Sequence, residues 1–201
     1  MQFFDRAYEG TPLWEIGRPQ PEMVRLEEEG AMVGRVVDVG CGTGETTLYL
    51  ARRGHPVWGI DISPNAIHRA EAKASERGIA TTFRVASALD LDHLGATFDT
   101  AVDSGLFHVF LDAHRPLYAD NVRKRLVPGG RLFLLCFSEE ELTDWGGPRR
   151  VTQAEIRATF RIGWTVRWIR PSHFEVTVPG VTGKAWLAEL RRTPDTSDSV
   201  R

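Results

Sequence analysis

The sequence predicts an α/β fold of the doubly wound, Rossmann-like kind, with helices on both faces of a mostly parallel sheet. Three observations lead to this fold class. Strand and helix signals alternate from about Arg35 to Arg170, a glycine-rich turn follows the first strand signal, and residues 131–137 are apolar on both faces. A strand that is apolar on both faces belongs in the middle of a helix-covered parallel sheet.

The repeating part of the chain contains five strand signals. Each is a β-branched or apolar run that ends at Gly, Pro or polar residues, and they cover 35–39, 56–61, 81–86, 98–103 and 131–137. Helix signals fit between them at 45–53, 64–78 and 113–126. Ser63 and Pro64 give a clear helix start, because serine caps a helix N-terminus and proline favours the first helical position.

Other segments lie outside this repeat. Residues 21–29 predict a helix, and the aromatic, proline-rich stretch from Tyr8 to Pro19 has the composition of a cover. After a helix signal at 152–160, further strands are predicted at 164–169 and 174–178, with either a strand or a helix at 184–191. We therefore expect one domain over residues 1–192, in which 1–30 form an N-terminal cover segment and helix and 138–150 form a candidate lid loop. The polar residues 193–201 are predicted to be a disordered tail.

Composition narrows the class of protein. The chain has 201 residues, of which 42% are hydrophobic and 26% charged, and its formal net charge is -2. These values predict one folded domain and leave no broad basic surface for nucleic acid. No apolar run approaches the roughly 20 residues of a membrane-spanning helix, and residues 1–10 lack the apolar core of a secretion signal, so we expect a cytoplasmic protein. The 2 cysteines and 6 histidines show no metal-site spacing, so no metal is expected. The oligomeric state stays open.

The most informative segment is a strand that runs into a turn with glycines at positions 40, 42 and 44. Such glycines let the backbone turn tightly and admit a flat ligand. The spacing G-x-G-x-G differs from the G-x-G-x-x-G that brings a pyrophosphate to a helix N-terminus, which favours a nucleoside ligand without phosphates. Asp61 ends the next strand, where a carboxylate accepts hydrogen bonds from both ribose hydroxyls. Asp38 adds a second negative charge, and two carboxylates suit a positively charged ligand such as S-adenosylmethionine. The alternative is an ordinary strand-to-helix turn.

These motifs resemble those of a known family. The run Asp38–Gly44 (DVGCGTG), the acid Asp61 and the run Leu126–Gly130 (LVPGG) look like class I S-adenosylmethionine-dependent methyltransferases over about residues 20 to 180. The resemblance implies a seven-stranded sheet whose last strand is antiparallel. More narrowly, residues 3–15 and 103–108 are similar to the thiopurine-methyltransferase-like group and to actinobacterial enzymes that methylate phenols, quinones and N-heterocycles.

The resemblance also implies a cofactor site. The glycines would line the methionine part of S-adenosylmethionine, Asp61 would hold the ribose, Ile62 would pack on the adenine, and Tyr8 and Trp14 would close over the cofactor. The expected cofactor-binding residues are Tyr8, Trp14, Asp38, Gly40, Cys41, Gly42, Gly44, Asp61, Ile62, Ser87, Ala88, Leu89 and Asp103. The family often has Asp for the adenine amino group where this chain has Ser87, so backbone groups are expected to substitute there.

Asp103 and His108 are the candidate catalytic groups, because they follow the fourth strand and a carboxylate or imidazole there can remove a proton from a phenol or N-hydroxyl group. Such a base is optional for methyl transfer. Asp103 as a turn or helix cap and His108 as a packed core residue are the alternatives. The residues expected to contact an acceptor are Trp14, Phe107, His108 and Trp145. Arg149 and Arg150 either steer an anionic acceptor or face solvent.

The predicted function is transfer of a methyl group to an O, N or S atom of a small aromatic or heterocyclic acceptor. Asp103–Leu106 lacks the Asn-Pro-Pro-Tyr type of motif by which base-flipping amino-methyltransferases hold a nucleobase. Two alternatives remain: a non-catalytic S-adenosylmethionine-binding module that regulates a partner, and a nicotinamide-dependent oxidoreductase, which the glycine spacing disfavours.

Overall fold

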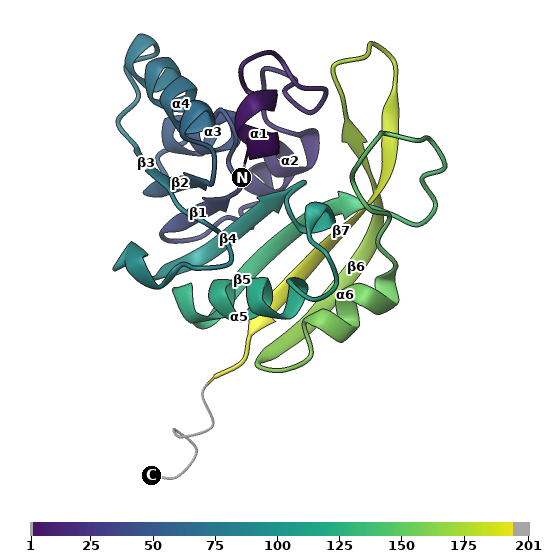
Figure 1. Ribbon diagram of the computed structural model, residues 1–201. Helices are drawn as coiled ribbons and strands as arrows, with labels where there is room; N and C mark the ends of the chain where they lie inside the picture. The colour runs from purple at the N-terminus through teal and green to yellow at the C-terminus, as the bar shows by residue number, and fades with distance from the viewer. Residues whose placement is uncertain (1, 195–201) are drawn as a thin grey trace, which may run out of the picture.

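A single sheet organises the chain, and the computed structural model describes residues 2–194. Within these residues, seven strands pair in the order β3-β2-β1-β4-β5-β7-β6 (Figure 1). Their bounds are β1 Val36–Val39, β2 Val57–Asp61, β3 Thr82–Val85, β4 Phe98–Ser104, β5 Leu126–Phe137, β6 Trp164–Glu175 and β7 Thr182–Arg192. Strands β1 to β5 pair in parallel, whereas β7 runs antiparallel to β5 and β6. The predicted fold class is confirmed.

Helices cover both faces of the sheet. Their bounds are α1 Gln2–Ala7, α2 Pro21–Glu28, α3 Glu45–Arg52, α4 Pro64–Glu76, α5 Arg115–Arg125 and α6 Gln153–Thr159, with short 3-10 turns η1 Asp92–Leu94 and η2 Phe107–Val109. Side chains of α5 and α6 join the largest core cluster on one face, and those of α2, α3 and α4 form two clusters on the other. None of the helices among residues 2–194 has the length and apolar character that crossing a bilayer requires.

The C-terminal third differs from the expectation in detail. Strand β6 is one strand of 12 residues, where the sequence suggested two pieces, and the segment near 184–191 is strand β7, not a helix. The continuity of β6 and the strand conformation of β7 follow from their antiparallel pairing along their whole length, with a register shift between Val166 and Trp168. Strand β5 also begins earlier than predicted, at Leu126. Residues 195–201 of the predicted tail lie outside the described residues.

The N-terminal segment carries a short helix, α1, which the sequence did not suggest. The Asp5 carboxylate Oδ1 accepts hydrogen bonds from the Ser63 hydroxyl at 2.7 Å and the Asn65 N–H at 3.1 Å. Arg69 donates to the carbonyls of Tyr8 and Gly10. These contacts fasten the segment to the start of α4, so it lies over the upper edge of the sheet in Figure 1.

Candidate active site

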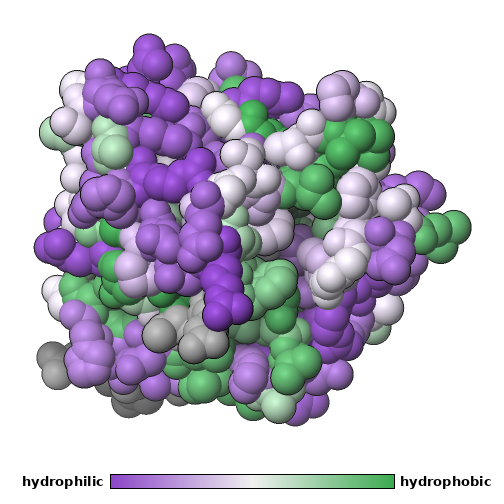
Figure 2. All heavy atoms as spheres, turned by 45° about the horizontal axis from the view of Figure 1, so that its top comes forward, coloured by the Kyte–Doolittle hydropathy of each residue, from purple (hydrophilic) through white to green (hydrophobic). Residues whose placement is uncertain are grey.

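A cavity of about 540 Å³ opens at the carboxyl edge of the parallel strands. Asp38 of β1, Asp61 of β2 and Ser104 of β4 all line it. In doubly wound sheets, ligands bind at this edge, outside the carboxyl ends of the strands. Figure 2 brings the top of Figure 1 forward and shows apolar residues gathered on this face beside hydrophilic ones. The lining itself combines carboxylates such as Asp38 and Asp61 with aromatic side chains such as Phe137, which suits a ligand with both polar and apolar parts.

The glycine turn lies directly under the N-terminal segment. Gly42 has a φ of 54°, and a Cβ atom built there would lie 2.7 Å from the Tyr8 hydroxyl oxygen. Any side chain at this position would therefore press against the cover and adopt a left-handed conformation that only glycine adopts readily. Gly42 keeps the floor of the cavity flat.

Gly44 has a packing role that the sequence did not suggest. It is the N-cap of α3 and does not line the cavity. A Cβ atom there would lie 2.8 Å from the ring of Phe83 and 3.0 Å from Ala70. Gly44 therefore lets α3 pack against β3 and α4, and its contact with the cofactor stays a prediction.

Two carboxylates give one end of the cavity a negative character. The backbone N–H groups of Gly42 and Ser63 each donate to a different oxygen of Asp61 at 2.9 Å. A carboxylate has about four acceptor lone pairs, so Asp61 keeps the capacity to accept a further hydrogen bond from a ligand. Asp38 accepts from the Thr47 hydroxyl at 2.7 Å. Burial raises the pKa of Asp38 to about 7, with further contributions from the charges of Asp103 and Asp61. A cation at this end of the cavity would lower that pKa.

The cover closes over the glycine turn through Tyr8 and Trp14. The Trp14 indole N–H donates to the Tyr8 hydroxyl at 2.9 Å, and the two rings meet edge to face at 6.1 Å between centroids. Burial raises the pKa of Tyr8, so its hydroxyl is neutral. Glu15 continues the attachment by accepting a hydrogen bond from the Thr43 hydroxyl at 2.5 Å.

Most of the residues predicted for the cofactor do meet in this cavity. Those that line it are Tyr8, Trp14, Asp38, Gly40, Cys41, Gly42, Asp61, Ile62, Ser87, Ala88 and Leu89. Among those predicted for the acceptor, Trp14, His108 and Trp145 also line it. Gly44, Asp103 and Phe107 do not.

Asp103 is a buried structural carboxylate. Its Oδ2 accepts from the Tyr118 hydroxyl at 2.6 Å, and its Oδ1 accepts from the N–H groups of Leu106 at 2.8 Å and Phe107 at 3.2 Å. The side chain is fully buried and lies outside the cavity lining. Its oxygens hold the turn after β4, which favours the turn or helix-cap alternative over the predicted catalytic or cofactor-binding role.

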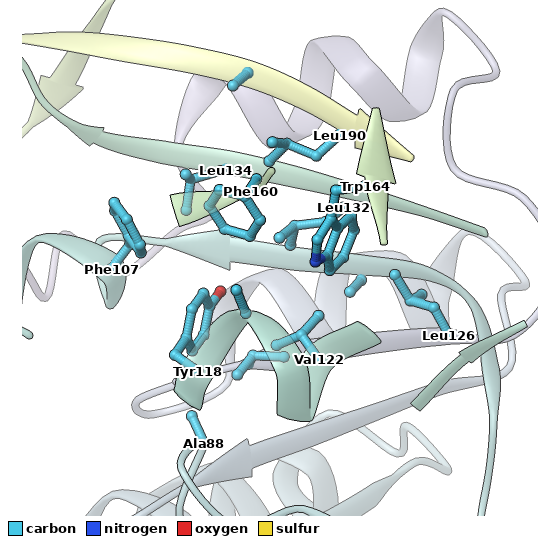
Figure 3. Packing of buried hydrophobic residues seen from close by; sticks show 14 of the residues in the cluster. Ala88, Phe107, Tyr118, Val122, Leu126, Leu132, Leu134, Phe160, Trp164 and Leu190 are labelled. Carbon is cyan, nitrogen blue, oxygen red and sulfur yellow. The ribbon is translucent and has the colours of Figure 1, made fainter. Parts of the chain in front are cut away.

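Phe107 belongs to the core. Its side chain is fully buried, and its ring lies 5.8 Å from that of Tyr118 and 5.6 Å from that of Phe160. Figure 3 shows these three aromatic side chains pointing toward one another between α5 and the sheet. This placement favours a core role for Phe107 over contact with an acceptor.

His108 sits at the other end of the cavity within an aromatic group. Its ring stacks on Phe137 at 4.9 Å and 10° between planes. Trp145 stacks on Phe137, with 5.9 Å between the ring centroids and 4° between the ring planes. The Phe137 N–H donates to His108 Nδ1 at 3.0 Å. The Nδ1 lone pair is therefore occupied by the Phe137 N–H and is not available to remove a proton from an acceptor. Only Nε2 is left for the predicted role of general base.

Several lining residues escaped the sequence reasoning. Phe174 and Val176 come from and just after β6, and Phe4 comes from α1. The Ser104 hydroxyl oxygen is buried, lines the cavity and has no hydrogen-bond partner among residues 2–194. The place of Ser104 in the cavity could have been predicted, since it follows Asp103 at the end of the fourth strand. The place of Phe174 could not, because only the register of β6 on β7 brings this side chain to the cavity. Within the described residues, no group of three or more His, Cys, Asp or Glu side chains could hold a metal ion.

The cavity fits S-adenosylmethionine on its own features. Asp61 has unused acceptor lone pairs, Asp38 and Asp61 give negative charge, and the glycine turn leaves space that a Cβ atom would fill. Lys73 contacts this turn through the Thr43 hydroxyl, but its ammonium group is paired with Glu15 and Glu45.

Comparison with known proteins gives the family. Residues 36–130 match a family profile described as a methyltransferase domain. The chain is 37% identical over 200 residues to 2-heptyl-1-hydroxyquinolin-4(1H)-one methyltransferase of Mycobacteroides abscessus, covering 94% of this chain and 88% of that protein. It is 34% identical over 151 residues to probable thiol methyltransferase 2 of Arabidopsis thaliana, covering 72% of this chain and 65% of that protein.

Solved structures agree. A structure from work on the conversion of a disulfide bond into a thioacetal group during echinomycin biosynthesis superposes with a TM-score of 0.89 at 35% identity, covering 96% of this chain and 92% of that one. Magnesium protoporphyrin IX methyltransferase of Synechocystis PCC 6803 with bound S-adenosylmethionine shares the fold, with a TM-score of 0.66 at 22% identity, covering 86% and 77%. By its relatives and its fold, the chain belongs to the class I S-adenosylmethionine-dependent methyltransferases.

Proposed function

We propose that this methyltransferase acts on a small, flat aromatic or heterocyclic acceptor and methylates an O, N or S atom of it. The observation that carries the proposal is the aromatic wall of the cavity. Phe137 and Trp145 lie nearly parallel, Phe174 packs against Phe137 at 5.4 Å, and all three line the cavity together with His108. Parallel and tilted aromatic side chains favour a planar ligand.

One relative is named for an acceptor of this class, and another for small acceptors that supply sulfur. The Mycobacteroides abscessus relative is named for a hydroxyquinolone, which is a flat N-heterocycle, and the Arabidopsis thaliana relative is named for thiols. Neither name selects the atom that this chain methylates. From these names we therefore propose for this protein only that its acceptor is small and flat.

The cofactor roles are part of the proposal. Asp61 would accept hydrogen bonds from the ribose hydroxyls, Ile62 would pack on the adenine, and Asp38 would face the positively charged methionine part. Ser87, Ala88 and Leu89 would border the adenine. When bound, S-adenosylmethionine supplies an electrophilic methyl group on a sulfonium. Tyr8 and Trp14 would then separate the reacting atoms from water.

Alignment is the main contribution that this chain makes to the reaction. Holding an acceptor against the aromatic wall fixes its distance and direction to the methyl group, and such positioning contributes up to roughly 7–11 kcal/mol in oriented reactions. The Asp38–Asp61 end fixes the cofactor from the opposite side. No proton donor or acceptor is needed for this part of the catalysis.

We also propose that residues 1–192 act as one domain and that the loop 138–150 is a lid over the acceptor. Trp145 in this loop supports the second point, because it lines the cavity and stacks on Phe137 of β5. Opening the loop would remove one face of the acceptor site. A cytoplasmic location and the absence of a nucleic-acid partner stay predictions, which cell fractionation and a binding assay with DNA and RNA would test.

The test is a panel of phenols, hydroxyquinolones, N-heterocycles and thiols incubated with S-adenosylmethionine, with methylated product detected by mass spectrometry. Turnover of flat acceptors in preference to aliphatic thiols supports the proposal. Trp145→Leu should raise KM for the best acceptor, whereas Leu142→Ala in the same loop should not, because Leu142 is 92% exposed. Tight cofactor binding with no turnover on the whole panel would instead favour the non-catalytic regulatory module.

A further inference from the structure

His108 presents a protonated nitrogen to the cavity. A neutral imidazole has one donor nitrogen and one acceptor nitrogen. Because Nδ1 accepts from the Phe137 N–H at 3.0 Å, the hydrogen lies on Nε2. No group among residues 2–194 hydrogen-bonds to Nε2, and the ring lines the cavity. Nε2–H is therefore free to donate to an acceptor atom of a ligand that enters the cavity in place of water.

The surroundings of His108 keep its ring neutral. Burial lowers the pKa of His108 to about 3, and the positive charges of Arg150 and Arg115 lower it further. Phe137 on β5 and Phe174 on β6 cover the ring with apolar surface. An imidazole in this state takes up a proton poorly, so it is a weak base at neutral pH.

Arg150 does not line the cavity itself but places a positive charge close to this end of it, on the ring of the lining residue Phe137. Its guanidinium lies 5.2 Å from the centre of the Phe137 ring and donates only to the carbonyl oxygens of Glu141, Thr143 and Pro148. In the described part of the chain no carboxylate pairs with it. Arg115 differs, because its charge is balanced by Asp112 and Glu155. The cavity thus has a negative cofactor end and a positive acceptor end.

We propose that the enzyme binds its acceptor as an anion, with His108 as a hydrogen-bond donor that positions it and Arg150 as the charge that favours it. The inference rests on the proposed function and narrows its substrate class to acidic phenols, thiophenols and N-hydroxy heterocycles. A lone pair of the anionic atom forms the bond to the methyl carbon, the carbon–sulfur bond breaks, and its electron pair stays on sulfur. The products are a neutral methylated acceptor and S-adenosylhomocysteine, so no proton has to leave inside the site.

The first test needs no turnover. Long-range proton–nitrogen NMR spectra of the protein loaded with S-adenosylhomocysteine report the tautomer and pKa of each histidine. The expected result for His108 is a neutral ring with hydrogen on Nε2 down to at least pH 5. A ring with hydrogen on Nδ1, or one that titrates near the ordinary histidine value of about 6.5, would overturn the assignment.

The second test uses a series of one acceptor scaffold whose substituents move its pKa from below to above 7. The acid limb of kcat/KM should follow the pKa of each free acceptor, because the anion is the form that binds. A limb that stays at one pH across the whole series would reveal a base on the enzyme and refute the proposal.

Variants separate the donor from simple packing. His108→Phe keeps an aromatic ring on Phe137 but removes the donor, and it should lower kcat/KM about 10- to 100-fold, the range for loss of a hydrogen bond to a charged group. His108→Gln restores an N–H donor and should recover most of that loss. A loss in His108→Gln with none in His108→Phe would mean that the ring only packs. His93→Gln, at a side chain that is 91% exposed, is the matched control.

Arg150 is tested by one substitution that keeps its positive charge and one that removes it. Arg150→Lys should keep the preference for ionised acceptors, whereas Arg150→Met should raise KM for them and leave KM for neutral acceptors unchanged.

The proposed function and the preference for an anionic acceptor can fail separately. If no acceptor is methylated, the proposed function fails. The part of the tryptophan fluorescence quenching by acidic and neutral ring compounds that is lost in Trp145→Leu then decides the charge preference. Equal binding of the two kinds would refute it.

Discussion

Tyr118→Phe tests whether Asp103 is structural, as the geometry indicates. In the wild type, the Tyr118 hydroxyl donates to Asp103 Oδ2 at 2.6 Å, and both side chains are fully buried. The substitution removes one hydrogen bond to a carboxylate and leaves the ring packing against Phe107 in place. Burial keeps water from replacing the lost donor.

The expected magnitude follows from that single contact. A hydrogen bond to a charged group contributes about 1.5–3 kcal/mol, and in a domain of this size each kcal/mol moves the melting temperature by roughly 2–4 °C. Tyr118→Phe should therefore lower the melting temperature by roughly 3–12 °C. Tyr49→Phe is the matched control, because the Tyr49 hydroxyl donates to Glu27 in a partly exposed position, where the loss should stay below about 1 kcal/mol.

Urea denaturation measures the free energy of unfolding, and initial rates with the best acceptor measure activity of the folded protein. The pH dependence adds a second readout. Burial raises the pKa of Asp103 to about 6 from 3.8, so its contribution to stability is full below about pH 4 and is lost as pH rises through 6. Relative to Asp103→Asn, the wild type should lose on the order of 3 kcal/mol across that window. Unchanged stability of Tyr118→Phe with at least a 100-fold fall in kcat would refute the structural role.

Three further predictions concern the cavity and the core. Gly42→Ala should weaken binding of S-adenosylhomocysteine in calorimetry, and Tyr8→Phe should relieve part of the loss, because the added methyl meets the Tyr8 hydroxyl oxygen; fully additive effects would contradict the contact. Asp38→Asn should be more stable than the wild type at pH 8 in urea, because the pKa of Asp38 is raised to about 7 and its ionised form disfavours folding. The same variant should bind S-adenosylmethionine at least about 10-fold more weakly, which is roughly 1.4 kcal/mol, and unchanged affinity would disprove its role. Phe107→Ala should cost about 3–5 kcal/mol of stability with little change in acceptor KM, whereas the reverse pattern would restore Phe107 to the acceptor site.

The cofactor end of the site could be predicted from the sequence because its determinants are local. The strand, the glycine turn and the helix after it are contiguous, and Asp61 ends the neighbouring parallel strand. Parallel order alone brings these residues to one edge of the sheet. The glycine spacing did not reveal that Gly44 serves helix packing, since a positive φ is common to all three glycines.

The acceptor end was harder because its geometry depends on distant pairing and on side-chain direction. Asp103 and His108 are close in sequence, yet the turn η2 directs the first into a buried hydrogen-bond network and the second into the cavity. Phe174 reaches the site only through the register of β6 on β7. The tautomer of His108 depends on the Phe137 N–H, which lies 29 residues away along the chain, so no local pattern could specify it.

Calorimetric titration of the purified protein with S-adenosylhomocysteine, with NADH in parallel, tests the central claim most directly. The account predicts micromolar binding of S-adenosylhomocysteine, about −8 kcal/mol, and no binding of NADH. Asp61→Ala should abolish most of the heat, because its carboxylate is the proposed ribose ligand. Folded wild-type protein that binds NADH, or that binds neither compound, would contradict the assignment of this cavity to the cofactor.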